Sequence, residues 1–397
     1  MPEEHARLSA SGAHRWLACP GSVVLEKNFP DFESAYAAEG TLAHSVGELK
    51  LQKYFFSGIG PVKFRKAMEK FRADPMWEDE IDRYTDEYFE EVKKQALSYK
   101  TKPFVAIEER VDYANWAPEG FGTADVLMIG GNELTVMDLK YGKGVPVSPE
   151  NNPQLMLYAL GAYDAYRLFF EIRKINLWII QPRIHNTASW SLTLDELLAF
   201  GENVKPIAKE AFAGSDKFRQ GEHCRFCKAK SRCSARASGM FAAVEEITPH
   251  IVRDPKGKAS TGGLLSNTQI ADFLEKTEGL SDWLKDLQEE ALTQLLAGNE
   301  VKGYKVVEGR SNRRIQDEPA LAKALMDAGY EEALIYKPKA LETITNLEKL
   351  CGKKVFETLG KDFVEKPQGK PTLVPESDPR PVYQKKPETL FTPVKGE

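Results

Sequence analysis

The sequence lacks long hydrophobic runs. No uninterrupted apolar stretch approaches the roughly 18 residues that a membrane-spanning helix needs. The N-terminal stretch MPEEHARLSASGAHRW shows no apolar core of a signal peptide. We therefore predict a soluble protein without a membrane partner, located in the cytoplasm. The chain also has no G-x-x-x-x-G-K-S/T phosphate-binding loop, so any helicase or ATPase activity would have to come from another protein.

Cysteine is scarce, with five residues among 397. An odd number in a long chain argues against a disulfide framework and favours reduced thiols or metal ligands. Three of the five, Cys224, Cys227 and Cys233, stand close together in HCRFCKAKSRC, at a spacing typical of metal ligands. Three thiolates leave a tetrahedral ion or an iron–sulfur cluster one ligand short. A fourth ligand must therefore come from another part of the chain.

An overall excess of positive charge is also missing, because the net charge is −5. Contact with nucleic acid would therefore have to come from a local basic surface. Positive residues gather from 217 to 236, around the three cysteines. Such a run is typical both of a solvated surface and of a surface that follows phosphates, and both interpretations stay open. The residues that we expect to contact DNA are Lys143, Arg225, Lys228, Lys230 and Arg232.

The order of periodic segments predicts an α/β fold with a central mixed sheet flanked by helices. Helical spacing over Ser34 to Tyr54 and Trp77 to Tyr99 precedes three strand-like runs, PFVAIEERVDY, GTADVLMIG and ELTVMDLKYG. A helix from Gln154 to Phe170 and the strand NLWIIQPR follow. The predicted divisions are an α/β domain over 1–250, a linker over 251–263, a mainly helical accessory domain over 264–362 and a proline-rich disordered tail over 363–397.

Two aspartates and a lysine lie where the second and third of these strands meet. A short turn between the strands predicts a hairpin, which brings Asp125 and Asp138 to the same end of the pair. Lys140 projects from the same face as Asp138, because side chains alternate along a strand. Two carboxylates and a lysine favour a site for a hard divalent cation. Taken alone, D-x-K is also common at solvated strand ends.

Further polar residues fall on predicted helices. Gln154 and Tyr158 share one helical face, which is either a buried polar stripe or a surface that presents an amide and a phenol to a phosphate. Thr41 is a candidate N-cap that would place His44 in a first helical turn. His44 and Glu48 form either a metal-facing pair or an ordinary surface contact.

The order of these motifs resembles the RecB-like branch of the PD-(D/E)XK nucleases. The shared elements are His44, G-x-x-D ending at Asp125, D-x-K from Asp138 to Lys140, and Q-x-x-x-Y from Gln154 to Tyr158, and the resemblance covers about residues 9 to 240. It implies a restriction-endonuclease-like core and a Mg²⁺- or Mn²⁺-dependent deoxyribonuclease, which we expect to act as an exonuclease. Two alternatives are a nuclease fold kept as an idle DNA-binding scaffold and a zinc-containing interaction module.

The resemblance also implies residue roles. The implied catalytic residues are Asp125, Asp138, Lys140, Gln154 and Tyr158. The implied metal ligands are His44, the two aspartates and the backbone carbonyl of Leu139. Glu109 is a further candidate for the metal shell, because related enzymes often place an acidic residue on this strand.

A subset of these nucleases carries an iron–sulfur cluster with one cysteine before the nuclease motifs and three after them. Cys19, in HRWLACPGS, fits this pattern and would complete a 4Fe–4S cluster with the three later cysteines. A zinc site with the same thiolates, or with His223 as a ligand, stays open. The opening LSASGAHRWLACPGS resembles phage and prophage proteins of DNA recombination or replication modules. That origin implies a bacterial host cytoplasm and a recombinase or single-strand-binding protein as partner.

Overall fold

A computed structural model describes residues 6–29, 35–56, 58–247, 267–277, 279–307 and 327. The chain divides into two units, Met1–Val307 and Glu308–Glu397. The account below concerns the first unit. The predicted linker, the later part of the predicted accessory domain and the predicted tail lie outside the described residues. Within the described part, no helix has the length and apolar character needed to cross a membrane.

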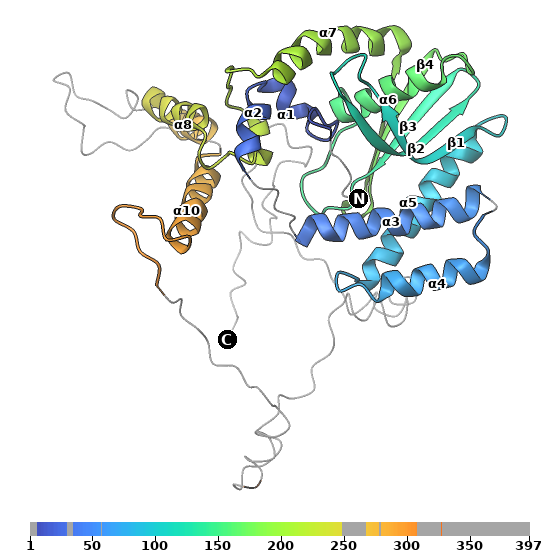
Figure 1. Ribbon diagram of the computed structural model, residues 1–397, viewed down its shortest axis with the longest axis horizontal. Coiled ribbons are helices and arrows are strands. Elements are labelled where there is room, and N and C mark those ends of the chain that lie inside the picture. Colours follow the sequence, from blue (N-terminus) through green and yellow to red (C-terminus); the bar gives the residue numbers. More distant parts are fainter. Residues whose placement is uncertain are drawn as a thin grey trace, which may run out of the picture. The chain divides into compact units, whose positions relative to one another are not determined.

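The described residues form one sheet of five strands in the order β1 to β5 (Figure 1). Strands β1, β2 and β3 pair antiparallel, β3 and β4 pair parallel, and β4 and β5 pair antiparallel. The predicted mixed sheet is therefore confirmed. The strands are β1 (Phe104–Asp112), β2 (Phe121–Gly130), β3 (Glu133–Leu139), β4 (Lys174–Gln181) and β5 (Asn186–Thr193).

Helices cover both faces of the sheet (Figure 1). The longer helices up to Ala213 are α3 (Ala35–Phe55), α4 (Pro61–Arg72), α5 (Asp79–Ser98), α6 (Pro153–Tyr166) and α7 (Leu194–Ala213). Short helices precede them: α1 (Ala13–Ala18), α2 (Ser22–Leu25) and the 3₁₀ turn η1 (Glu26–Asn28). The other described helices are η2 (Pro182–Ile184), η3 (Glu222–Phe226), α8 (Ser234–Ile247), α9 (Asn267–Lys276) and α10 (Leu280–Leu296).

Side-chain alternation divides the core between the two faces. Leu127 and Val136 pack with apolar residues of α6 and α7, whereas Met128 and Met137 pack with residues of α3 and α5. Neighbouring strand residues point to opposite faces, so strands that are apolar at nearly every position must be covered on both sides. The sequence of β2 and β3 has this character, and the α/β/α layering follows from it.

The helix that follows the β2–β3 hairpin begins where the sequence indicates. The Asn152 side chain accepts hydrogen bonds from the backbone N–H groups of Gln154 and Leu155, and Pro153 occupies the first helical position. Both features are preferred at helix N-termini. The N-cap prediction for Thr41 is wrong, because α3 already begins at Ala35 and the Thr41 hydroxyl donates to the backbone carbonyl of Ala37 in mid-helix.

Candidate metal centre and cysteine site

The β2–β3 hairpin brings the two predicted aspartates to one end of the sheet. Val126 pairs with Met137, so Asp125 and Asp138 are the next residues on their strands at this end. Oδ2 of Asp125 accepts a 2.6 Å hydrogen bond from the N–H of Leu139. The predicted geometry of the hairpin is confirmed. The carbonyl of Leu139 as a metal ligand stays a prediction.

Three side chains from three elements form a group that could hold a metal ion. Nδ1 of His44, from α3, lies 3.4 Å from Oδ1 of Asp125. Glu108, from β1, completes the group, and one ligand atom of each residue lies within 4.8 Å of the others. It is the only such group of three or more His, Cys, Asp or Glu residues in the part of the chain that the structure describes. The two carboxylates are suitable ligands for Mg²⁺ or Mn²⁺, and the imidazole is a common ligand of divalent transition metals.

The acidic residue of β1 in this group is Glu108, and Glu109, the residue predicted for the metal shell, is not a member of the group. Glu109 instead accepts a hydrogen bond from the Tyr166 hydroxyl at 3.2 Å. Glu108 has a φ of 50°, a left-handed backbone conformation that is costly for a residue with a Cβ atom. Regular pairing continues at Ile107 and Glu109 on either side of it. Strain of this kind is common at functional sites.

Electrostatics couple the three members of the group. Burial opposes the charge on His44, but the carboxylates of Asp125, Asp138 and Glu108 outweigh it and raise the pKa of His44 to about 9. Burial, reinforced by the charge of Asp125, raises the pKa of Glu108 to about 8. Burial also opposes the ionised form of Asp125, yet His44 and the Leu139 N–H hold the pKa of this carboxyl below its usual value. His44 and Glu108 therefore carry protons that a bound cation would displace.

Asp138 belongs to a second set of contacts, formed with Lys140 and α6. Nζ of Lys140 lies 2.8 Å from Oδ2 of Asp138 and donates to Oε1 of Gln154 at 2.9 Å. Nε2 of Gln154 lies 3.1 Å from Oδ1 of Asp138 and 3.3 Å from the Tyr158 hydroxyl. The predicted shared faces of Asp138 with Lys140 and of Gln154 with Tyr158 are confirmed. The structure does not bring Asp138 into the group of His44.

One oxygen of Asp138 has spare capacity. Oδ2 is buried and forms an ion pair with Lys140 by distance, but it receives no aligned hydrogen bond from the described residues. At 2.8 Å the two opposite charges attract each other whatever the angle. Burial raises the pKa of Asp138, and Lys140 only partly offsets this. The free lone pair of Oδ2 is therefore suited to accept a cation.

Two residues that the sequence analysis missed hold the loop between Lys140 and α6. The Gln181 side chain accepts a hydrogen bond from the N–H of Val147 at 2.7 Å. The Arg183 guanidinium forms an ion pair with Glu39 at 2.9 Å and lies 4.6 Å from the ring centroid of Tyr141. Their place at the end of β4, beside the parallel strand β3, was the signal that could have revealed them.

The four predicted cluster cysteines line one enclosed cavity, together with His223 and Arg236. Cys19 follows α1, whereas Cys224, Cys227 and Cys233 come from η3 and the segment after it. All four are free thiols, and all except Cys233 are buried. The structure therefore brings Cys19 together with the three later cysteines, as predicted from the split pattern. Cys351 lies outside the described residues.

His223 lies beside the thiols with one ring nitrogen already in contact with the backbone. Its Nε2 lies 2.9 Å from the carbonyl oxygen of Arg219. Hydrogen bonds with Cys19 and Cys224 raise the pKa of His223 to about 10. For Cys19 and Cys224, burial opposes ionisation, but bonds from His223 and the backbone lower the thiol pKa.

Some basic residues around the cysteines form ion pairs with α10, and others are exposed. Lys230 and Arg232 form ion pairs with carboxylates of α10, at 2.7 Å to Asp286 and 2.6 Å to Glu290. Lys230 and Arg232 were predicted to contact DNA, and these carboxylates of the same chain would compete with DNA phosphates for them. Arg225 and Lys228 are exposed. Nζ of Lys143 lies 3.4 Å from Glu80 while most of its side chain is exposed.

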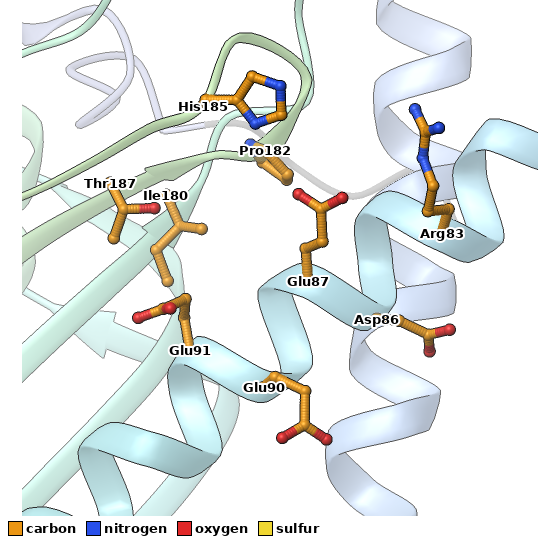
Figure 2. A pocket seen from close by; sticks show the side chains of 9 residues that line it. All are labelled: Arg83, Asp86, Glu87, Glu90, Glu91, Ile180, Pro182, His185 and Thr187. Carbon is orange, nitrogen blue, oxygen red and sulfur yellow. The ribbon is translucent and has the colours of Figure 1, made fainter. Parts of the chain in front are cut away.

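A groove between α5 and the β4–β5 turn has the opposite charge. Figure 2 shows Glu87 and Glu91 pointing from α5 toward the strands, whereas Asp86 and Glu90 point away from them. Arg83 is a basic residue of the same wall. A surface with this excess of carboxylates repels polyanions. The remaining lining residues are Ile180, Pro182, His185 and Thr187.

Comparison with known proteins gives a family and one distant structure. The solved structure described as the crystal structure of SSO0001 is 16% identical over 59% of this chain and 90% of that chain, with a TM-score of 0.26. Residues 5–381 match the model of the family described as "Protein of unknown function (DUF2800)", so the chain belongs to this family.

Proposed function

We propose that this protein is a metal-dependent deoxyribonuclease with a PD-(D/E)XK-type site. The observation that carries the proposal is the joint placement of two sets of side chains at one end of the sheet. His44, Glu108 and Asp125 form a ligand group, and Asp138 holds Lys140 beside it. A cation site next to a buried lysine is suited to the hydrolysis of a phosphodiester.

The residues present fit a divalent cation. His44, Glu108 and Asp125 would hold Mg²⁺ or Mn²⁺, and the free lone pair of Asp138 would add to them. The bound cation would lower the pKa of a water and offset charge on the phosphate. Lys140 would orient the attacking water through its ammonium group. Gln154 would keep Lys140 and Asp138 in register, since its amide contacts both.

The cysteine cavity supports a 4Fe–4S cluster better than zinc. Zinc–sulfur bonds of about 2.3 Å imply tetrahedral sulfurs roughly 3.8 Å apart. In the described residues, no three of these sulfurs lie within 4.8 Å of one another. Four thiolates bound to four different irons lie farther apart than this. Iron, sulfide and zinc analysis with a visible spectrum of anaerobically purified protein separates the two cofactors.

The test of the catalytic site uses two adjacent glutamates. Glu108→Gln should abolish Mn²⁺-dependent cleavage of linear DNA and weaken Mn²⁺ binding by at least about tenfold, because it removes a ligand. Glu109→Gln makes the same chemical change one residue later, where the side chain contacts Tyr166, and should leave both properties nearly unchanged.

Equal activity of the two variants would overturn the assignment of Glu108. Absence of cleavage by the wild-type protein with either metal, on single- and double-stranded substrates, would favour the alternative of an idle DNA-binding scaffold. Colourless protein with one bound zinc would favour the zinc-containing interaction module. The proposed metal centre would then rest on the cleavage and Mn²⁺-binding results alone.

A further inference from the structure

The N-terminal segment and the cysteine segment enclose a polar pocket that the proposed catalytic site does not use. Its lining includes cations from four places in the chain and hydroxyl groups beside them. Glu26 is the one acidic residue among the lining residues. The cations are Arg7, Arg15, Lys27 and Lys228, and the hydroxyls are Ser9, Ser11 and Ser22.

The single carboxylate of the pocket is already occupied. One oxygen of Glu26 lies 2.8 Å from the Arg15 guanidinium, and the other accepts a 2.8 Å hydrogen bond from the N–H of Lys228. Glu26 therefore holds the two segments together and neutralises Arg15. The charges of Arg7 and the exposed Lys27 are left to attract an anion.

Two buried polar atoms of the pocket lack partners among the described residues. They are Nε of Arg7 and Oγ of Ser22. The residue Ser22 is only 2% exposed. The Arg7 guanidinium lies 4.7 Å from the ring centroid of Phe212, which fixes its position. A buried donor without an acceptor costs stability, and an incoming oxyanion would remove that cost. These atoms point to a ligand with phosphate-like chemistry.

An exposed aromatic ring lies next to the pocket. Arg15 donates a 3.0 Å hydrogen bond to the carbonyl of Phe226, whose side chain is 72% exposed. The guanidinium of Arg225 lies 5.8 Å from the centroid of that ring. An exposed aromatic ring beside cations is typical of surfaces on which an unpaired base stacks. The bases of a duplex already stack on one another, so this arrangement favours a single strand.

The pocket is anchored to the strand that carries a proposed metal ligand. The Tyr113 hydroxyl lies 3.0 Å from the carbonyl of Leu8 and 3.0 Å from the carbonyl of Phe121. Leu8 lies between pocket residues Arg7 and Ser9, and Phe121 begins β2, which contains Asp125. A strand held in the pocket would therefore be fixed relative to β2.

We propose that the pocket and Phe226 bind single-stranded DNA. Arg7 and Lys27 contact successive phosphates, and the Phe226 ring stacks on a base. This inference rests on the proposed nuclease function and names the substrate form that the site takes. It also assigns the basic surface to the N-terminal segment, because α10 occupies Lys230 and Arg232.

The test measures binding of a labelled oligonucleotide in EDTA, where no cleavage occurs, at several salt concentrations. The double variant Arg7→Gln/Lys27→Gln should lower the slope of log K against log salt by about 1.4, since each single-strand phosphate contact contributes about 0.7. Lys27→Gln alone, at an exposed position, should lower it by about 0.7. Lys66→Gln/Lys70→Gln, on exposed positions of α4, removes the same charge and should not change the slope.

Phe226→Ala should weaken single-strand binding about fivefold or more and leave duplex binding unchanged. Unchanged slopes in both pocket variants, or equal losses for duplex and single strand in Phe226→Ala, would overturn the inference. Cleavage with Mn²⁺ is measured separately. If the wild-type protein cleaves DNA but the pocket variants bind it unchanged, the pocket is not the binding site and the proposed nuclease function stands. If binding depends on the pocket but the wild-type protein does not cleave DNA, the binding site stands and the nuclease function is rejected. A wild-type chain that binds no DNA rejects both.

Discussion

The protonation of single residues determines when the metal centre can be filled. His44 and Glu108 have pKa values raised to about 9 and about 8, so both hold protons at neutral pH. A cation must displace these protons, and affinity for Mn²⁺ should therefore rise with pH up to about 9, by up to roughly tenfold per unit for each proton displaced.

Calorimetric titration in buffers of different ionisation enthalpy measures the proton release directly. Glu108→Gln should release fewer protons than the wild-type protein, and Glu109→Gln should release the same number. Affinity that stays constant from pH 6 to 9 would contradict this prediction.

Glycine at position 122 allows Tyr158 to reach the site. A Cβ atom at Gly122 would lie 2.7 Å from Cε1 of Tyr158. Gly122→Ala should therefore displace the ring and its contact with Gln154, lowering stability by about 1–3 kcal/mol and reducing cleavage. Gly144→Ala, with open space around its Cβ, should change neither. Chemical denaturation and cleavage assays report the two effects; equal stability of both variants would show that Tyr158 can move without cost.

Some residues of the site were predictable and others were not, for a local reason. Asp138 and Lys140 follow from strand alternation, which the chain keeps in β3. In AIEERVDY, the same rule places Glu108 and Glu109 on opposite faces without saying which faces the metal. The left-handed backbone at Glu108 depends on tertiary contacts that a sequence pattern does not contain. The paired state of Lys230 likewise depends on α10, far along the chain.

Helices and strands with a regular spacing of apolar residues were predictable, because the residues buried on one face recur at the period of the element. Strands β2 and β3 are almost continuously buried, and their apolar runs reveal them. Strand β5 is an edge strand in which only Leu192 is buried, so NTASWSLT has little hydrophobic signal. Helix α7 begins with a capping box between Thr193 and Glu196, which is a signal that the sequence does contain.

Helix α10 is held to the cysteine segment by a buried ion pair. Asp286 accepts from the nearly buried Arg236 at 2.7 Å and also pairs with Lys230. Asp286→Asn should cost about 3–5 kcal/mol of docking free energy, because it leaves Arg236 buried without a counter-charge. The exposed Asp282→Asn is the matched control. Limited proteolysis of α9 and α10, and the exposure of Trp283, would report the loss; identical digestion of both variants would contradict it.

Acid should have the same effect on this helix. Burial opposes the ionised form of Asp286, but Lys230 and Arg236 outweigh it and lower the pKa of the carboxyl. A lowered pKa contributes stability above the usual carboxyl range, and that stability is lost as pH falls through the folded value. Undocking of α10 is thus expected only in acid, and docking should be unchanged from pH 6 to 8.

For the whole first unit, the cysteine cavity brings together distant parts of the chain, which the proposed 4Fe–4S cluster would cross-link. Sγ of Cys19 lies 3.4 Å from the backbone nitrogen of Arg219, 200 residues later. Cys227→Ala should give protein that is insoluble or rapidly digested near Arg15 and Arg219, since closing so long a loop restricts the unfolded chain strongly. Ser238→Ala, on an exposed position of α8, should behave like the wild-type protein. A soluble, protease-resistant Cys227→Ala would show the site to be dispensable.

The same cross-link sets an order of events during synthesis. At roughly 5–20 residues per second, Cys19 leaves the ribosome on the order of 10–40 s before the three cysteines that share its cavity. The cavity cannot close until Cys233 has emerged, so Cys19 remains a free thiol until then. The emergence of Cys233 therefore sets the earliest time at which the cavity can form. Oxidation of the nascent chain before that time would block the site.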